Sequence, residues 1–262
     1  MLLAIDSGNT NVVFAVFDGD VLKGVWRTAT DGRRTADEYA VWLMQLMALE
    51  QLGRADVSDA VIASVVPQST FNLKLLCRRY FGCEPVVVGD DGADLGIKVL
   101  LDRPEEIGAD RLVNAVAALV KKVVPAIVVD FGTATTFDVI DSKGNYCGGA
   151  IAPGINLSME ALHLAAAKLP RIDIRRPRHV VGKSTIEAMQ SGIFWGYVGL
   201  IEGLIRRIQD ERGEKMTVIA TGGLAALFRD ATPAITAIDP DLTLRGLVEI
   251  HRRTRAPSPP PR

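Results

Sequence analysis

One short pattern occurs twice in this 262-residue chain, and it constrains the fold more than any other feature. An apolar run ends at Asp6 with Gly8 two residues later, and a second apolar run ends at Asp130 with Gly132 two residues later. A stretch of alternating apolar and polar residues follows each glycine. Each copy therefore predicts a buried strand, a tight turn and a returning strand. Because the copies lie about half a chain length apart, we expect two related halves.

Both turns have the composition of a phosphate-binding loop. Glycine lets the backbone approach a ligand closely, and successive N–H groups form a nest for an anion. A carboxylate at the end of a buried strand suits a hydrated cation or a reacting hydroxyl group. A plain hairpin is the alternative for each turn alone, since Asn and Gly favour turns, but the duplication favours function. Two such turns facing each other across a cleft would hold a nucleoside triphosphate.

The order of elements predicts an α/β fold. Residues 2–28 indicate three short strands, and strands at 60–66 and 85–88 alternate with helices, the first of which opens with the capping box Thr35-x-x-Glu38. This order predicts an antiparallel meander extended by parallel strands. The second half repeats it. We expect domains at 1–106 and 107–255, and a disordered Pro-rich tail at 256–262.

Composition narrows the class of protein. The net charge of −1 gives no basic excess for nucleic acid or an anionic membrane, and no apolar run is long enough for a membrane helix. With no secretory signal at the N-terminus, we expect a cytoplasmic protein. The cysteines have no metal-like spacing and are expected to be reduced thiols, and none of the scattered histidines is expected to bind metal. These residues are Cys77, Cys83, Cys147, His163, His179 and His251.

Two further motifs are candidates for chemistry. Gly108-Ala-Asp110-Arg111 begins a helix and offers a carboxylate, a cation and free N–H groups, which suits a small hydroxylated acid and the removal of its hydroxyl proton. The alternative is that Asp110 caps the helix and Arg111 is a surface charge. Thr221-Gly222-Gly223 follows a predicted strand and suits a nucleotide's sugar or α-phosphate, although a simple helix-initiating turn has the same composition.

A stripe of glycines runs along the long helix predicted at 184–211. A glycine inside a helix costs about 1 kcal/mol relative to alanine, so the stripe predicts a very close contact with another element. The partner is either a second copy of the chain or the protein's own sheet. The glycines are Gly192, Gly196, Gly199 and Gly203.

These motifs together resemble the type III pantothenate kinase family, over essentially the whole chain except the tail. The matching segments are residues 6–11, 108–111, 130–136, 148–154 and 221–223. The family belongs to the superfamily of acetate and sugar kinases, Hsp70 chaperones and actin. The resemblance therefore implies two ribonuclease-H-like domains with a cleft between them. It also implies ATP-dependent phosphorylation of pantothenate to 4′-phosphopantothenate, the first step of coenzyme A biosynthesis, by a homodimer.

The resemblance also implies residue roles. Asp110 would be the catalytic proton acceptor, Asp6 would lie near Mg²⁺-ATP, and Asp130 would bind a monovalent cation, K⁺ or NH₄⁺. The ATP phosphates would bind Asp6, Ser7, Gly8, Asn9, Thr10, Asn11, Val12, Val13 and Thr133. Pantothenate would bind Gly108, Ala109, Asp110, Arg111 and Thr185.

One position departs from the family. Leu101 stands where an aromatic residue, often Tyr, is usual, which puts one substrate contact in doubt. Two other functions stay open. One is a non-enzymatic transcriptional accessory protein on the same fold, which the presence of all three acidic residues disfavours. The other is a related kinase or phosphatase with a different small substrate, which the Gly-Ala-Asp-Arg motif disfavours.

Overall fold

The computed structural model describes residues 1–166 and 169–256. The chain forms two compact units: residues 1–122 together with the C-terminal helix from residue 241, and residues 123–240. The expected boundary after residue 106 thus differs from the observed division. Segments 107–122 and 241–255 belong to the first unit because their helices pack against its sheet. Apart from Ala256, the predicted tail lies outside the described residues.

The sheet of the first unit has the strand order β3-β2-β1-β4-β5. Strands β1, β2 and β3 pair antiparallel, and β4 and β5 extend the sheet in parallel. The predicted meander with parallel extension is therefore confirmed. The strands are β1 (Leu2–Ser7), β2 (Asn11–Asp18), β3 (Val21–Ala29), β4 (Asp59–Ser64) and β5 (Val86–Val87).

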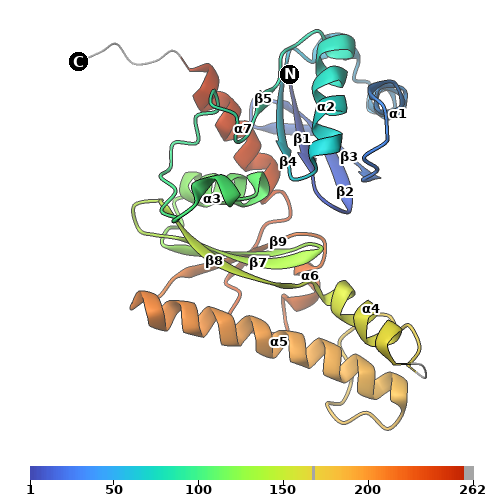
Figure 1. Cartoon of the computed structure of the whole chain (residues 1–262), viewed down its shortest axis with the longest axis vertical. Helices are drawn as coiled ribbons and strands as arrows, with labels where there is room; N and C mark the ends of the chain where they lie inside the picture. Colours follow the sequence, from blue (N-terminus) through green and yellow to red (C-terminus); the bar gives the residue numbers. More distant parts are fainter. Residues whose placement is uncertain (167–168, 257–262) are drawn as a thin grey trace. The chain divides into compact units, whose positions relative to one another are not determined.

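Helices cover both faces of this sheet (Figure 1). On one face lie α1 (Ala36–Leu49), which begins at the predicted capping box of Thr35 and Glu38, and α2 (Pro67–Leu76), which continues as a π-helical turn (Cys77–Phe81). On the other face, α3 (Ala109–Val120) packs with α7 (Leu242–Arg255). Short 3₁₀ segments occupy Arg54–Asp56 and Pro104–Glu106.

The second unit repeats the same sheet. Its order, β10-β9-β6-β7-β8, places three antiparallel strands beside two parallel ones, so both units have the expected ribonuclease-H-like arrangement. The strands are β6 (Ala126–Phe131), β7 (Ala134–Ile140), β8 (Tyr146–Pro153), β9 (Thr217–Thr221) and β10 (Ala237–Ile238). The helices are α4 (Ile155–Ala165), α5 (Thr185–Arg212) and α6 (Ala225–Phe228), and α5 runs along one face of the sheet (Figure 1).

The duplicated carboxylates occupy equivalent places in the two sheets. Asp6 and Asp130 are each the fifth of six residues in the central strand. Both strands have four buried residues before the aspartate, a half-buried aspartate and a buried residue after it. The predicted internal duplication is therefore present in both strand order and burial.

The glycine stripe does not pack against the protein's own sheet. Side-chain carbons placed at Gly192, Gly196 or Gly199 would meet no atom within 4 Å among the described residues, and these three glycines are exposed. The apolar side of α5, including Phe194 and Ile201, faces the sheet instead. Of the two expected partners, the protein's own sheet is therefore excluded for the part of the chain that the structure describes.

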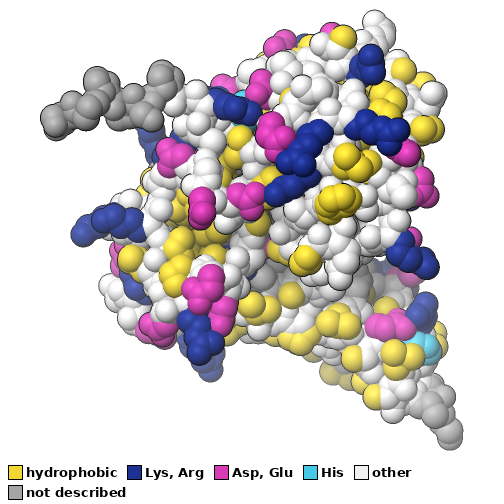
Figure 2. Space-filling view, turned by 45° about the horizontal axis from the view of Figure 1, so that its top comes forward, with side chains coloured by type: hydrophobic (Ala, Val, Ile, Leu, Met, Phe, Trp, Pro, Cys, Tyr) yellow, Lys and Arg dark blue, Asp and Glu magenta, His cyan; other side chains and the backbone are white. Residues whose placement is uncertain are grey.

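Within residues 1–166 and 169–256, the helices lack the combination of length and hydropathy that a membrane crossing needs. Charged side chains of both signs are interspersed on the face seen in Figure 2. This distribution agrees with the small net charge of the sequence.

Candidate functional site

Asp6 lies on the face of the first sheet that carries α3 and α7. Side chains alternate along a strand. Leu3 and Ile5 pack in the core with α1 and α2, whereas Leu2 and Ala4 pack with α3 and α7. The half-buried carboxylate of Asp6 therefore belongs to the second of these faces, and its neighbour Ser7 belongs to the first.

The turn after Asp6 is held by backbone contacts. The N–H of Gly8 donates to the carbonyl of Asn11 at 3.0 Å, and the N–H of Val65 donates to the carbonyl of Ser7 at 3.0 Å. Asn9, Thr10 and Asn11 are exposed, as a ligand-binding turn requires.

Two predicted ATP-binding residues have buried side chains. The hydroxyl of Ser7 is inaccessible and has no hydrogen-bond partner among the described residues, and the side chain of Val12 lies in the core. A ligand at this turn would therefore meet only the backbone of Ser7 and Val12. Val13 is half-buried.

The Gly-Ala-Asp-Arg motif forms the start of α3. Gly108 is the N-cap residue and Asp110 the second residue of the helix, so Asp110 is not the N-cap. Its Oδ1 atom accepts a hydrogen bond from the N–H of Arg111 at 2.8 Å. Burial raises the pKa of Asp110, although the N–H and the charge of Arg111 act in the opposite direction. A carboxylate with a raised pKa is a better proton acceptor.

The start of α3 lies next to the end of β1. A side-chain carbon at Gly108 would lie 2.5 Å from Oδ1 of Asp110 and 3.3 Å from Cγ1 of Val65. Val65 is the residue whose N–H holds the carbonyl of Ser7. The first unit thus brings the Asp6 turn and the residues Gly108, Ala109, Asp110 and Arg111 together. A residue larger than glycine at position 108 would displace the Asp110 carboxylate, which explains the glycine there.

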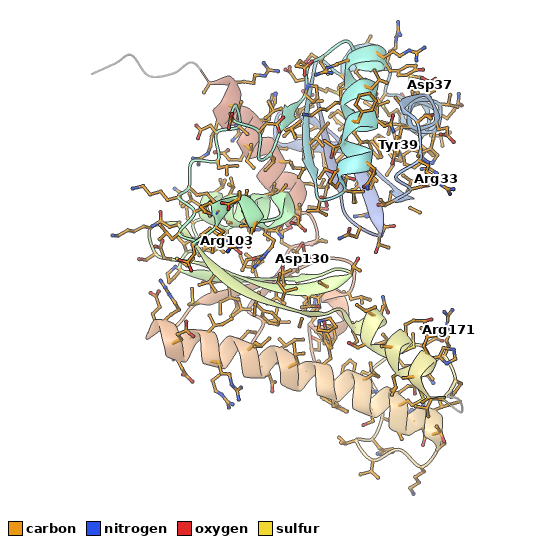
Figure 3. All side chains as sticks on the ribbon, in the orientation of Figure 1. Arg33, Asp37, Tyr39, Arg103, Asp130 and Arg171 are labelled. Atoms are coloured by element: carbon orange, nitrogen blue, oxygen red, sulfur yellow. The ribbon has the colours of Figure 1, made fainter. Side chains whose placement is uncertain are left out.

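Asp130 lies on the face of the second sheet opposite α5, because its neighbours Val129 and Phe131 pack in the core with α5 (Figure 3). Gly222 lies directly against the carboxylate of Asp130. With a φ of +88°, Gly222 occupies the left-handed region, and a side-chain carbon there would lie 2.6 Å from Oδ1 of Asp130 and 2.6 Å from the carbonyl of Phe131. The Thr221-Gly222-Gly223 motif therefore shapes the surroundings of Asp130.

Backbone hydrogen bonds hold the turn after Asp130, and one of them comes from the N-cap residue of α4. The N–H of Gly132 donates to the carbonyl of Ala134 at 3.0 Å, and the N–H of Gly154 donates to the carbonyl of Thr133 at 3.0 Å. A side-chain carbon at Gly154 would overlap the carbonyl of Thr133. The glycine at the N-cap of α4 is therefore required by the close approach of this turn.

Thr185 is the first residue of α5 and is exposed. The hydroxyl of Ser184 caps the helix by accepting a hydrogen bond from the N–H of Glu187 at 3.2 Å. Thr185 belongs to the unit of Asp130, whereas Asp110 belongs to the unit of Asp6.

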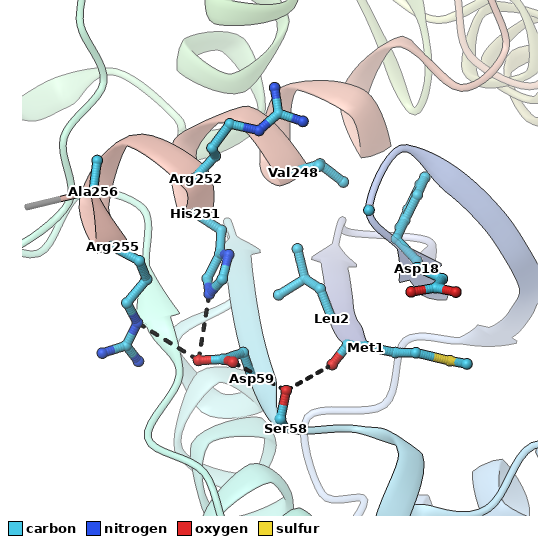
Figure 4. A pocket seen from close by; sticks show the side chains of 12 residues that line it. Met1, Leu2, Asp18, Ser58, Asp59, Val248, His251, Arg252, Arg255 and Ala256 are labelled. Atoms are coloured by element: carbon cyan, nitrogen blue, oxygen red, sulfur yellow. Dashed lines mark hydrogen bonds and ion pairs between the residues drawn. The ribbon is translucent and has the colours of Figure 1, made fainter.

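A cavity of about 470 Å³ lies at the other end of the first sheet, near the starts of β1 and β4 and under the last turns of α7 (Figure 4). There Nε2 of His251 and Nε of Arg255 lie 3.5 Å and 3.7 Å from Oδ1 of Asp59. Burial lowers the pKa of His251, although Asp59 opposes this shift. Asp6 is at the opposite end of β1, so this cavity is not part of the predicted site.

The described cysteines are free thiols, and the described residues contain no group of three or more His, Cys, Asp or Glu side chains that could hold a metal ion. A cation at Asp6 or Asp130 would therefore need oxygens of the backbone or of a bound ligand besides the carboxylate. Magnesium prefers oxygen ligands and is commonly held by one or two carboxylates together with phosphate oxygens. The two aspartates fit such sites.

Comparison with known proteins identifies the family. The family model for type III pantothenate kinase matches residues 2–207. A type III pantothenate kinase from Paramagnetospirillum magneticum is 70% identical, with 98% of this chain and 99% of the relative covered. Another, from Rhodospirillum rubrum, is 66% identical, with 97% and 99% covered.

A solved structure shares the fold at much lower identity. A Campylobacter jejuni protein assigned to the Baf family of transcriptional activators has a TM-score of 0.61 and 18% identity, over 96% of this chain and 98% of its own. At that identity the likeness concerns the fold alone, whereas the family model covers the site residues up to Thr185 and the relatives cover nearly the whole chain. The chain belongs to the type III pantothenate kinase family.

Proposed function

We propose that this protein transfers the γ-phosphoryl group of ATP to the primary hydroxyl group of pantothenate, giving 4′-phosphopantothenate and ADP for coenzyme A biosynthesis. The observation that carries this proposal is the arrangement of the first unit. The exposed turn after Asp6 is suited to phosphate, and the N–H of Val65 donates to the Ser7 carbonyl in front of it. The side chain of Val65 lies next to Gly108, beside the half-buried Asp110 carboxylate, whose pKa is raised. Phosphoryl transfer needs this pair, because positioning and charge stabilisation provide most of its catalysis.

Asp110 is the proton acceptor in this mechanism. The hydroxyl oxygen of pantothenate attacks the γ-phosphorus, the bond from that phosphorus to the β-phosphate bridging oxygen breaks, and the hydroxyl proton passes to the Asp110 carboxylate. The hydrogen bond from the N–H of Arg111 fixes one carboxylate oxygen, Oδ1. In this proposal Oδ2 receives the proton. Gly108, Arg111 and the backbone of Ala109 form the rest of the pantothenate contact at this helix start, since the Ala109 side chain is buried in the core. Thr185 is a further contact.

The backbone of residues 6–13 and Thr133 holds the ATP phosphates in this proposal. Mg²⁺ near Asp6 would neutralise phosphate charge, and a monovalent cation at Asp130, K⁺ or NH₄⁺, would do the same from the second unit. Asp130 is half-buried at the end of β6, where a potassium-sized ion could bridge its carboxylate and phosphate oxygens. The close backing by Gly222 fixes where its Oδ1 lies. Equal activity in potassium, sodium and cation-depleted buffer would contradict the proposal that Asp130 binds a monovalent cation.

The proposed active form is a homodimer. Three glycines of the stripe on α5, Gly192, Gly196 and Gly199, are exposed, and a side-chain carbon at any of them would meet no described atom within 4 Å. Large apolar side chains are also exposed on α4 and before α5, with Leu164 at 74% and Val181 at 80% exposure, and apolar side chains gather on the lobe that holds α4 (Figure 2). Such surfaces mark association sites. Sedimentation equilibrium at micromolar concentration should give twice the chain mass, and a monomer would contradict the proposal.

The function is tested by ADP formation from Mg-ATP with and without pantothenate, in potassium and in sodium. We expect ADP to form only with pantothenate, and faster in potassium. ATP turnover with another hydroxylated acid would identify a different small-molecule kinase. The absence of turnover with every substrate would indicate a non-enzymatic member of the fold.

A further inference from the structure

Thr30 holds the Asp6 turn from outside the motif. It follows the last residue of β3 and is half-buried. Its hydroxyl donates to the carbonyl of Gly8 at 2.6 Å, and its backbone N–H donates to the carbonyl of Thr10 at 2.9 Å. One residue therefore binds two carbonyl groups of the turn, although Thr30 lies 22 residues after Gly8 in the chain.

These two bonds determine where the N–H groups of the turn point. In a trans peptide group the N–H points away from the carbonyl of the preceding residue. The Gly8 carbonyl is directed at the hydroxyl of Thr30, so the N–H of Asn9 is directed away from Thr30. The Thr10 carbonyl is directed at the N–H of Thr30, so the N–H of Asn11 is also directed away. N–H groups turned in this way are the donors that a phosphate requires.

We propose that Thr30 is a positioning residue for ATP, which fixes the Asn9 and Asn11 N–H groups toward the phosphates without touching the nucleotide itself. This inference rests on the proposed function, because it takes the Asp6 turn to be a phosphate site. The hydroxyl is the part of Thr30 that a substitution can remove, since the backbone N–H remains in every variant. Loss of the hydroxyl frees the Gly8 carbonyl and the peptide group that carries the Asn9 N–H.

The second unit holds its turn by a different means. There the carbonyl of Thr133 accepts from the backbone N–H of Gly154, and no side-chain hydroxyl is involved in that bond. The effect of removing a hydroxyl should therefore be specific to the first turn. Thr28 provides a matched control, because it is a half-buried threonine two residues away whose hydroxyl accepts from Nη1 of Arg34.

The test compares Thr30→Val, Thr30→Ser and Thr28→Val in the full-length protein. Removing one hydrogen bond of this kind changes an equilibrium by about three- to tenfold. We expect Thr30→Val to raise the KM for ATP by about that factor, with little change in the KM for pantothenate. Thr30→Ser keeps a hydroxyl and should restore the KM for ATP to within about twofold. Thr28→Val should leave it unchanged.

A melting-temperature series with Mg-ATP separates positioning from stability. A purely structural role predicts a lower melting temperature for Thr30→Val but an unchanged KM and an unchanged shift on adding Mg-ATP, which would overturn the inference. Equal kinetics for Thr30→Val and wild type would also overturn it. If the valine variant does not fold, Thr30→Ala gives the same comparison. A wild-type protein without pantothenate-dependent ADP formation and without Mg-ATP stabilisation would instead contradict the proposed function.

Discussion

The turn after Asp6 and the turn after Asp130 begin alike and are supported differently. Both follow the fifth residue of a buried central strand, and both aspartates are half-buried. Both turns are exposed, and the first is held by Thr30, the residue that follows β3. The second is held by the backbone N–H of Gly154, and a side-chain carbon at Gly222 would clash with its aspartate. Duplication therefore preserved the strand and the carboxylate, whereas the contacts that hold each turn diverged.

We propose that the two halves have distinct tasks. The first turn shares its unit with Asp110, the proton acceptor that we propose. The second has its half-buried carboxylate next to Gly222, and its own unit has no Gly-Ala-Asp-Arg motif at a helix start. We therefore expect substitutions around the first turn to change turnover, and substitutions around the second to change stability and the response to cations.

The largest effect is expected for Asp110→Asn. The amide keeps the shape and can still accept from the N–H of Arg111, but it cannot take a proton. A general base contributes roughly 10²–10⁴-fold, so kcat should fall by that order while Mg-ATP still stabilises the protein. A folded variant with near-normal turnover at saturating pantothenate would contradict the base assignment, and the role would then move to Asp6 or Asp130.

The pH dependence of turnover tests the same group in the wild-type protein. Burial raises the pKa of Asp110, and only the ionised carboxylate can accept a proton. Turnover should therefore fall as pH decreases through this raised pKa, by about tenfold for each pH unit below it. For stability the sign is opposite: burial favours the protonated form in the folded state, so stability from this group is lost as pH rises through the folded pKa. Asp110→Asn should remove both dependences.

Gly222→Ala and Gly8→Ala compare the supports of the two turns directly. The alanine at 222 would require a left-handed φ and would clash with Asp130, which we expect to destabilise the protein by about 1–3 kcal/mol. At Gly8 the nearest atom to a new side-chain carbon is the Asn11 carbonyl at 3.5 Å, an ordinary contact. Chemical denaturation should therefore show a smaller loss for Gly8→Ala. Equal losses would mean that the two turns are equally constrained.

The smallest effect is expected for Gly199→Ala on the open face of α5. Alanine favours a helix over glycine by about 1 kcal/mol, and the added carbon meets no described atom in the chain. A monomer should therefore become slightly more stable. If the stripe lies in a dimer interface, the added carbon should weaken the dimer, and sedimentation at decreasing concentration would detect this. A lower melting temperature without any change in dimer dissociation would contradict both expectations.

The sequence predicted the repeated core because its signals are local. An apolar run ending in Asp-x-Gly sets a buried strand and a turn, and the capping box at Thr35 and Glu38 sets the start of α1. Strand order followed from the succession of elements. The roles of the site residues remain predictions.

Contacts between residues far apart in the sequence were not predictable in this way. The domain boundary differed because the apolar face of α7 does not specify its partner, and only folding shows that Leu247 packs with Val113 and β1. Thr30 has no signal of its own, since a threonine at a strand end is common. Gly222 was noticed as a turn residue, but its contact with Asp130 depends on the pairing of β6 with β9.

The central claim is that this chain phosphorylates pantothenate, and the product itself tests it most directly. Wild-type protein is incubated with Mg-ATP and pantothenate in potassium buffer, and the mixture is analysed by phosphorus NMR and mass spectrometry. We predict one new phosphate monoester on the primary hydroxyl of pantothenate, formed in equal amount to ADP and nearly absent with Asp110→Asn. ADP without this ester, or an unchanged mixture from folded protein, would contradict the account.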